Sequence, residues 1–205
     1  MEDNKRRKIG IIGGTFNPVH IGHLLLAEWA KEAQGLDEIL FIPTGCSYIK
    51  QQCSVLAGSE RMKMVELAIQ DRSDFFCCDI EINRPGNTYT YETLEMLHIN
   101  NPGAEYFFLM GADCLFAIES WKCPDRIFNS CTIIAALRDG NSLPQMQAKC
   151  LQLEKRFHGK IELLPFISLG ISSSEIRKRV AAGHSVRYLI PDTVLDYINL
   201  KHFYQ

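Results

Sequence analysis

The 205-residue sequence lacks any hydrophobic run as long as the roughly 18 apolar residues of a membrane-spanning helix. It also lacks an excess of one charge, because 22 Lys and Arg face 24 Asp and Glu, a formal net charge of −2 at pH 7. It contains no repeat and no low-complexity tract. These absences argue against a membrane protein and against broad electrostatic binding to nucleic acid or anionic lipid. The expected partner is a small molecule.

The N-terminal stretch lacks a secretory signal, although a basic segment, Met1–Lys8, precedes the charge-poor segment Ile9–Ala27. Two adjacent glycines, a proline and two histidines interrupt the second segment, and a signal peptide needs an unbroken apolar core there. The sequence therefore predicts a cytoplasmic protein. With 46% hydrophobic residues, it also predicts a single globular domain over residues 1–205, with a flexible N-terminus at residues 1–7.

The cysteines lack the spacing of a zinc or redox site, because no Cys-x-x-Cys pair occurs. Many lie within apolar runs, where a reduced cysteine behaves as a small hydrophobic residue. We therefore expect reduced, mostly buried thiols. The eight are Cys46, Cys53, Cys77, Cys78, Cys114, Cys123, Cys131 and Cys150.

Short apolar runs alternate with segments of helical periodicity along the whole chain. Strands are predicted at Lys8–Ile12, Glu38–Ile42, Phe75–Ile80, Tyr106–Met110, Thr132–Leu137 and Lys160–Leu164. Helices are predicted at Ile21–Ala33, Arg61–Ile69, Glu92–His98, Leu143–Phe157 and Ser172–Ala182. This alternation predicts an α/β protein with a Rossmann-like open parallel sheet and helices on both faces. Ligands of such sheets bind beyond the carboxyl ends of the strands.

The first predicted strand runs into Gly13-Gly14-Thr15-Phe16-Asn17-Pro18-Val19-His20-Ile21-Gly22-His23. Paired glycines let backbone amides approach a ligand, and the helix that follows presents its positive end. His20 and His23 are three residues apart at the helix start, so their rings lie on one face and can donate hydrogen bonds to phosphate oxygens. The segment matches neither the phosphate loop of nucleoside triphosphatases nor the dinucleotide fingerprint.

Other interpretations of these histidines remain open at this point. Each could be a core histidine with satisfied hydrogen bonds, or half of a metal site. None of the remaining histidines belongs to a recognisable ligand pair, so the phosphate interpretation is preferred and no metal ligands are predicted. The glycine between the two histidines, Gly22, is expected to leave room for the ligand.

The His-x-Gly-His motif resembles that of the nucleotidyltransferase superfamily. The segment Gly13–Leu24 is similar to the opening of the bacterial nicotinate mononucleotide adenylyltransferase family, and further stretches resemble it in the same order to about Leu200. By this resemblance, Gly13, Gly14, Thr15 and Phe16 contribute to ATP binding together with His20 and His23.

The same resemblance assigns residues to the pyridine mononucleotide, the acceptor. The segment from Glu81 to Thr90 resembles the family's stretch that closes over the pyridine ring, so Tyr89 is expected near the ring and Thr90 at its carboxylate. By this resemblance, Trp121 is expected to stack on the ring. If the resemblance is set aside, Trp121 is interpreted equally well as a large core side chain. Gly111 and Asp113, directly after a predicted strand, are expected to contact ATP.

The segment Ile171-Ser172-Ser173-Ser174-Glu175-Ile176-Arg177 reads on its own as a helix start, with a capping box from Ser172 to Glu175. It resembles the superfamily motif that holds the triphosphate, so Ser172, Ser173 and Arg177 are expected at ATP. Arg179 is interpreted as a solvated helix charge.

These resemblances imply an adenylyltransferase that joins ATP and nicotinate mononucleotide and releases pyrophosphate in NAD biosynthesis. The attacking group is a phosphate, already anionic at pH 7, so alignment and charge stabilisation matter more than a general base. His20, His23 and Arg177 are the expected catalytic residues, with Mg2+ as the cofactor of ATP. Alternatives are an enzyme that accepts nicotinamide mononucleotide or both acceptors, and a nucleotide-sensing protein without catalysis. A homo-oligomer is compatible with the sequence.

Two stretches depart from the family's pattern. The loop after Thr44 has Ser47-Tyr48-Ile49-Lys50 where the family often has Pro-Pro-His-Lys, so only Lys50 stays a candidate phosphate contact. Arg138-Asp139-Gly140 stands where Arg-Pro-Gly is common, and Arg138 is an expected acceptor contact. Asn17 replaces the aspartate that is usual in bacterial members.

Overall fold

The computed structural model describes residues 6–47, 55–137, 143–165 and 169–205, and Lys50 and Arg138 lie outside them. The chain forms two compact units. The first comprises Met1–Ile12, Leu26–Leu40 and Tyr89–Ile167, and the second comprises Gly13–Leu25, Phe41–Thr88 and Ser168–Gln205. Each unit therefore gathers segments that are far apart in the sequence.

The main sheet has six strands in the order β4-β2-β1-β6-β7-β8. These strands are β1 (Lys8–Gly14), β2 (Glu38–Pro43), β4 (Phe75–Cys77), β6 (Glu105–Gly111), β7 (Thr132–Ala136) and β8 (Ile161–Leu164). Parallel pairing joins β1 to β6, β6 to β7 and β7 to β8. The strand order reverses between β1 and β6, which is the switch point where doubly wound sheets bind their ligands.

The helices of the described residues include five that were predicted, each within three residues of its expected start. These are α1 (Ile21–Gln34), α2 (Gly58–Ile69), α3 (Thr90–Asn100), α6 (Leu143–Phe157) and α7 (Ser173–Ala181). Right-handed crossovers put helices that follow β1 and helices that follow β6 on opposite faces of the sheet. The predicted Rossmann-like fold, with helices on both faces, is therefore confirmed.

Sequence periodicity missed the short elements. These are β3 (Cys46–Ser47), β5 (Asn87–Thr88), α4 (Ala112–Ala117), the 3-10 helix η1 (Ile118–Ser120), α5 (Pro124–Ser130) and α8 (Asp192–Leu200). All of these except α8 have two to seven residues, which give too few turns for a periodic signal. Strand β4 is also shorter than predicted, because Asp79 begins a turn in which its carboxylate accepts a hydrogen bond of 2.6 Å from the Asn83 amide.

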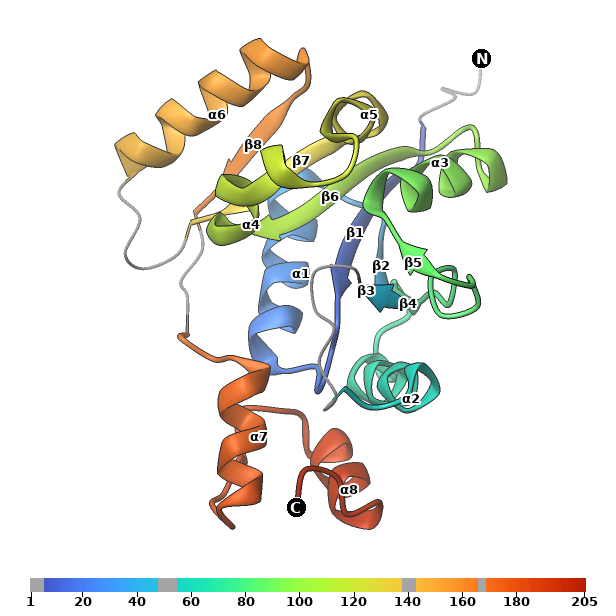
Figure 1. Ribbon diagram of the computed structural model, residues 1–205, viewed down its shortest axis with the longest axis vertical. Helices are drawn as coiled ribbons and strands as arrows, with labels where there is room; N and C mark the ends of the chain where they lie inside the picture. Colours follow the sequence, from blue (N-terminus) through green and yellow to red (C-terminus); the bar gives the residue numbers. More distant parts are fainter. Residues whose placement is uncertain (1–5, 48–54, 138–142, 166–168) are drawn as a thin grey trace. The chain divides into compact units, whose positions relative to one another are not determined.

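The core of the first unit is built from the central strands, which are apolar without alternation because parallel strands are covered on both faces. Residues such as Ile11, Leu109 and Ile134 are almost completely buried. Gly10 belongs to this core, since a Cβ atom there would lie 2.5 Å from the Ile39 side chain. Figure 1 shows α3 beside α5, and these two helices pack together in the first unit. Among the described residues, no helix is long and apolar enough to cross a membrane.

Candidate functional site

Residues 13–20, called the glycine loop from here on, comprise the last two residues of β1 and its connection to α1, and they belong to the second unit. The loop folds around the side chain of Phe16, which is 1% exposed and whose backbone has a left-handed φ of 48°. A Cβ atom on Gly14 would lie only 3.0 Å from the Phe16 ring. The second glycine of the pair therefore provides room for an aromatic side chain that anchors the loop from inside.

The two histidines of the motif lie against each other at the start of α1. Their ring centroids are 3.7 Å apart with the planes 27° from parallel, and His20 is buried. The backbone amide of His20 donates a hydrogen bond of 3.2 Å to Nδ1 of His23. Since Nδ1 accepts, a neutral His23 carries its proton on Nε2. That nitrogen is a donor, as contact with a phosphate oxygen requires.

The structure gives a different explanation for the glycine at position 22 from the one expected. A Cβ atom at this position would lie 3.1 Å from Cε1 and Nδ1 of His20. The glycine thus makes room for the histidine ring itself, and the expectation that it makes room for a ligand is not needed to explain it.

Helix α7 is tied to the glycine loop within the second unit. The Ser173 hydroxyl donates a hydrogen bond of 2.8 Å to the carbonyl oxygen of Pro18. The Arg177 guanidinium donates one of 2.8 Å to the carbonyl oxygen of Asn17. The predicted cap is also present, because the Ser172 hydroxyl accepts from the Glu175 amide at 3.2 Å. The two segments that sequence analysis assigned to phosphates therefore lie side by side.

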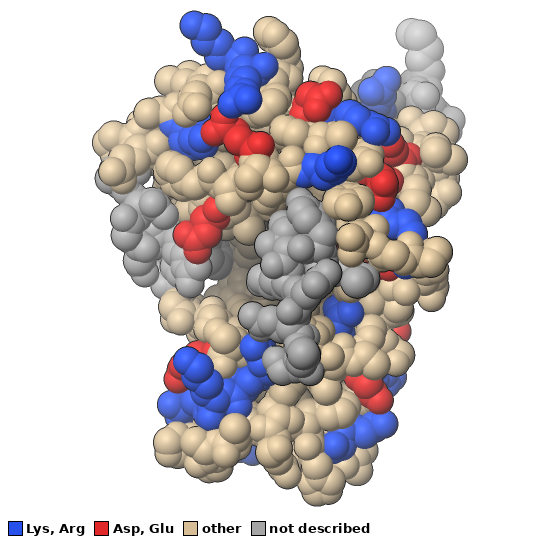
Figure 2. All heavy atoms as spheres, viewed as in Figure 1, with Lys and Arg blue, Asp and Glu red and all other residues tan. Residues whose placement is uncertain are grey.

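The surface over α7 is rich in cationic side chains. Figure 2 shows Lys and Arg gathered where Figure 1 places this helix. Arg179 is more than a solvated charge, because its Nε and one terminal nitrogen donate to the Ser185 carbonyl oxygen at 3.1 and 3.0 Å. Arg179 thereby fixes the turn after α7, whereas Arg177 faces the glycine loop.

Sequence analysis missed Arg61, a buried cation of the second unit. Its side chain is 4% exposed and donates to three carbonyl oxygens, those of Leu56 at 3.0 Å, Thr15 at 2.8 Å and Thr44 at 2.8 Å. Burial lowers the pKa of this guanidinium. Arg61 joins the glycine loop to the end of β2 and to the start of α2. The available signal was its position on the buried stripe of α2, beside Met64 and Val65.

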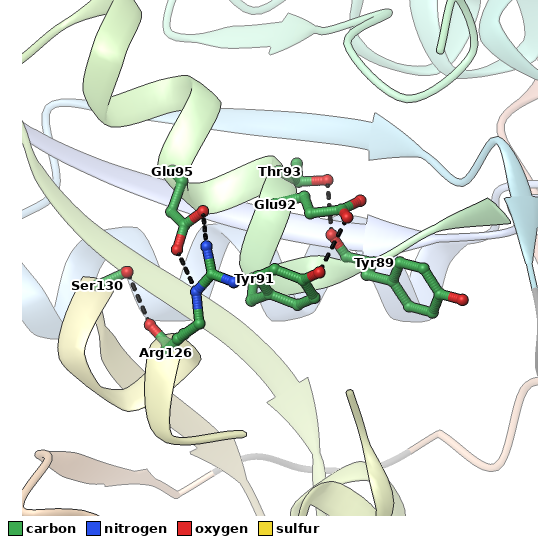
Figure 3. A network of polar contacts seen from close by, with 7 residues as sticks. All are labelled: Tyr89, Tyr91, Glu92, Thr93, Glu95, Arg126 and Ser130. Atoms are coloured by element: carbon green, nitrogen blue, oxygen red, sulfur yellow. Dashed lines mark hydrogen bonds and ion pairs between the residues drawn. The ribbon is translucent and has the colours of Figure 1, made fainter. Parts of the chain in front are cut away.

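A second polar cluster, called the tyrosine network from here on, lies in the first unit. It comprises Tyr89, Tyr91, Glu92, Thr93, Glu95, Arg126 and Ser130 from α3, the residue before it, and α5 (Figure 3). Tyr89 is the N-cap of α3, and its carbonyl oxygen accepts hydrogen bonds from the backbone amide of Thr93 at 3.1 Å and from the Thr93 hydroxyl at 3.2 Å. The preceding residue, Thr88, belongs to the second unit, and its hydroxyl donates to Glu81 at 2.8 Å.

Contacts between side chains also hold the tyrosine network. Arg126 binds both carboxylate oxygens of Glu95, with Nε at 2.6 Å, and its guanidinium lies 4.3 Å from the centre of the Tyr91 ring. The rings of Tyr91 and Tyr89 are stacked 6.1 Å apart. The Tyr91 hydroxyl donates to Glu92 at 2.9 Å, and this bond raises the pKa of Tyr91. Figure 3 shows the Tyr89 ring directed away from Glu95 and Arg126.

Trp121 follows η1 in the first unit and is half-buried. Its ring meets the Phe108 ring edge to face, with centroids 6.2 Å apart. Trp121 is therefore not a fully buried core residue. Gly111 ends β6 with open space around it, since an added Cβ would meet no atom within 4 Å, and Asp113 is exposed in the first turn of α4.

Six cysteines whose side chains the structure describes are not in disulfides, but they are less buried than expected. Only Cys150 is fully buried, Cys114 is exposed, and four are half-buried. Burial raises the pKa of Cys77 and of Cys131 to about 12, so neither supplies a thiolate near neutral pH. The described part of the chain contains no group of three or more His, Cys, Asp or Glu that could hold a metal ion.

Comparison with known proteins identifies the family. The cytidylyltransferase-like family model matches residues 11–179. A "probable nicotinate-nucleotide adenylyltransferase" of Lachnoclostridium phytofermentans is 42% identical over 97% of this chain and 99% of its own. The chain belongs to the nicotinate-nucleotide adenylyltransferase family. A member from Dehalococcoides mccartyi is 40% identical over 96% of this chain and 97% of its own.

Solved structures match the fold of this nicotinate-nucleotide adenylyltransferase family member along almost its whole length. The nicotinic acid mononucleotide adenylyltransferase of Plasmodium falciparum, complexed with NaAD, superposes with a TM-score of 0.79 at 23% identity over 97% of both chains. The same enzyme complexed with APC gives a TM-score of 0.76 at 22% identity. As a member of this family, the protein is a nucleotidyltransferase that acts on nucleotide substrates.

Proposed function

We propose that the protein transfers the AMP moiety of ATP to nicotinate mononucleotide and releases pyrophosphate, giving the dinucleotide deamido-NAD. The observation that carries this proposal is the junction of the glycine loop with α7 in the second unit. The chain is also 42% identical to the probable nicotinate-nucleotide adenylyltransferase of Lachnoclostridium phytofermentans. The junction brings two histidines, an arginine and a helix N-terminus to one place. Such a set of donors is suited to the charged oxygens of a triphosphate.

In the proposed reaction, a phosphate oxygen of the acceptor attacks the α-phosphorus of ATP. The new bond joins that oxygen to the α-phosphorus, and the bond from the α-phosphorus to the bridging oxygen of the β-phosphate breaks. The electron pair of the broken bond leaves with pyrophosphate. No proton has to be removed from the nucleophile, so catalysis consists of alignment and of charge stabilisation by preorganised donors.

His23 is assigned the central donor. Its Nδ1 accepts from the amide of His20, and its Nε2–H is proposed to donate to a phosphate oxygen. His20 stacks on it and is proposed to contact the same phosphates. Arg177 uses one nitrogen for the Asn17 carbonyl oxygen and has further N–H groups for the leaving pyrophosphate. The loop residues Gly13 to Phe16 are proposed to contribute backbone contacts to ATP.

Nucleotidyltransferases that act on ATP usually require a divalent metal ion. We propose that this ion is Mg2+ bound to the triphosphate. The described residues of the second unit fit this arrangement, because the donors near the glycine loop are cationic or neutral and match phosphate oxygens rather than the metal. The ion supplies charge neutralisation on the phosphates when it is bound.

Recognition of the acceptor is assigned to the first unit. Trp121, backed by Phe108, offers part of its indole face to an electron-poor pyridine ring. Tyr89 caps α3 and Thr90 begins it, so a carboxylate near Thr90 would face the positive end of that helix. A nicotinate carries this negative charge, whereas a nicotinamide does not. The helix end therefore favours nicotinate mononucleotide.

The test is pyrophosphate release from ATP and Mg2+ with nicotinate mononucleotide, nicotinamide mononucleotide, phosphopantetheine or no acceptor. We expect strong activity with the first acceptor, and weaker activity with the second. Equal rates with both pyridine nucleotides would refute the role assigned to the N-terminus of α3, but they would still support the proposed transferase reaction. No release with any acceptor, from protein that still binds ATP, would overturn the proposed reaction in favour of a sensing role.

A further inference from the structure

Asn17 is the residue at which the contacts around the glycine loop converge. It is 2% exposed, and it lies in the middle of the loop. Its backbone carbonyl oxygen accepts from Arg177. Its side-chain oxygen accepts from the Tyr204 hydroxyl at 2.8 Å and from the Leu56 amide at 3.4 Å. Asn17 therefore connects Tyr204 and Leu56, which bind its side chain, with Arg177, which binds its backbone carbonyl oxygen.

Tyr204 is separated from Asn17 by 187 positions in the sequence but lies in the same unit. The segment after α8 turns back through a hydrogen bond of 3.0 Å from the Phe203 amide to the Ile198 carbonyl oxygen. Tyr204 then adopts a left-handed φ of 65°, a backbone conformation that residues with a side chain rarely adopt. This conformation directs the phenol into the cluster of Asn17, Arg177 and Arg61.

The environment of the phenol favours its protonated form. Burial raises the pKa of Tyr204, and the two nearby cations Arg177 and Arg61 only partly oppose this shift. The hydroxyl is therefore a donor over the whole range in which the enzyme would work. Asn17 is the acceptor of this donor, and Asn17 holds Arg177.

We propose that Tyr204 is a positioning residue for the triphosphate: its hydroxyl fixes Asn17, and through Asn17 it fixes the direction of the Arg177 guanidinium. This inference rests on the proposed function of the glycine loop and α7. It adds to the phosphate site a segment that no motif connects with nucleotides. Tyr204 itself touches no phosphate in this proposal, so its effect must pass through Arg177.

The experiment compares Tyr204→Phe with Tyr197→Phe. Both changes remove one phenolic hydroxyl from the same part of the chain, and the Tyr197 hydroxyl donates to Glu60 instead of the loop. We expect Tyr204→Phe to weaken MgATP binding, measured by titration calorimetry, and to lower kcat, each by about five- to tenfold, as the loss of one hydrogen bond implies. The KM for the acceptor should stay unchanged. Tyr197→Phe should change none of these values.

A double-mutant cycle separates positioning from a general loss of structure. If Tyr204 acts through Arg177, the Tyr204→Phe change should have little further effect in an Arg177→Ala background. Full additivity of the two changes would overturn the proposal, as would unchanged ATP binding in Tyr204→Phe or an equal loss in Tyr197→Phe. ATP affinity is measured without turnover, so these results do not depend on the transferase reaction. If the proposed reaction itself is wrong, the unmutated protein will bind ATP but release no pyrophosphate.

Discussion

The glycine loop and the tyrosine network are held in place by different kinds of contact. Around the glycine loop, Arg61, Ser173 and Arg177 all donate to backbone carbonyl oxygens. In the tyrosine network, Arg126 instead binds the side chains of Glu95 and Tyr91, and it is an exposed residue. The first arrangement fixes the course of the backbone, and the second fixes the directions of side chains.

This difference matches the tasks proposed for the two regions. Backbone amides and a histidine pair must keep a single geometry to stabilise charge in a transition state, and buried donors to carbonyl groups enforce such a geometry. An aromatic surface for a pyridine ring tolerates small shifts, and an exposed ion pair contributes little to stability. Changes at the glycine loop should therefore affect stability and turnover, and changes at the tyrosine network should affect acceptor affinity.

The largest effect is expected for Arg61→Met. The change removes the donor of three carbonyl oxygens, among them those of Thr15 and Thr44, and leaves them without this partner. We expect the free energy of unfolding to fall by about 3 kcal/mol or more, measured by denaturant titration. Arg61→Lys should be intermediate, because lysine keeps the charge but not the planar set of donors. A fall of less than 1 kcal/mol in Arg61→Met would contradict the role given to backbone contacts.

The second-largest effect is expected for His23→Ala, and it concerns the turnover rate. Losing one preorganised donor should lower the rate of pyrophosphate release by about two orders of magnitude or more, with the fold intact. His184→Ala is the matched control, because His184 is exposed in the same unit and outside the glycine loop. Near-normal turnover in folded His23→Ala protein would refute the proposed mechanism.

Trp121→Ala should distinguish the acceptor from ATP. Removing the indole takes away the proposed stacking surface, so the KM for nicotinate mononucleotide should rise about tenfold, within the range measured for base stacking on aromatic side chains. The KM for ATP should change little. Equal losses for both substrates would mean that the tryptophan only supports the packing around Phe108.

Arg126→Met should have the smallest effect. It breaks the pair with Glu95 and uncovers the Tyr91 ring, which stacks on Tyr89. We expect about a threefold rise in the acceptor KM and a stability change below 1 kcal/mol. A large loss of stability would show that the two regions are not held differently after all.

The chain offers a close control for that change. Arg72 also binds a carboxylate through two nitrogens, that of Asp74 at 3.0 Å, and also covers an aromatic ring, that of Phe75 at 4.2 Å. It lies in the second unit, outside the tyrosine network. Arg72→Met should thus leave the acceptor KM unaltered while changing stability by a similar small amount.

The long elements of the fold were predictable from the sequence because their physical cause is local. Strands β1, β6 and β7 are covered on both faces and are therefore continuous apolar runs, and α6 begins and ends at the predicted residues. The short helices α4 and α5 were not predicted. Their buried residues, such as Leu115 and Ile127, are too few to form a periodic pattern.

Part of the candidate site was predictable for a related reason. The histidine pair and the Ser172 cap depend on residues three positions apart, so the sequence displays their geometry directly. The contacts of Arg61 with Thr15 and of Tyr204 with Asn17 span 46 and 187 positions. Nothing in the local sequence indicates such a contact, apart from a charged residue on a buried helical stripe.

The sequence by itself therefore determined the alternating strands and helices and the family of this nucleotidyltransferase, and it indicated the segments that are proposed to bind phosphates. These properties rest on periodicity, capping and short motifs, which act over a few residues. Only the tertiary structure decided that Asn17 receives Arg177 and Tyr204, and that buried Arg61 secures the glycine loop. The reason is that a buried donor must find its acceptor wherever the folded backbone places one.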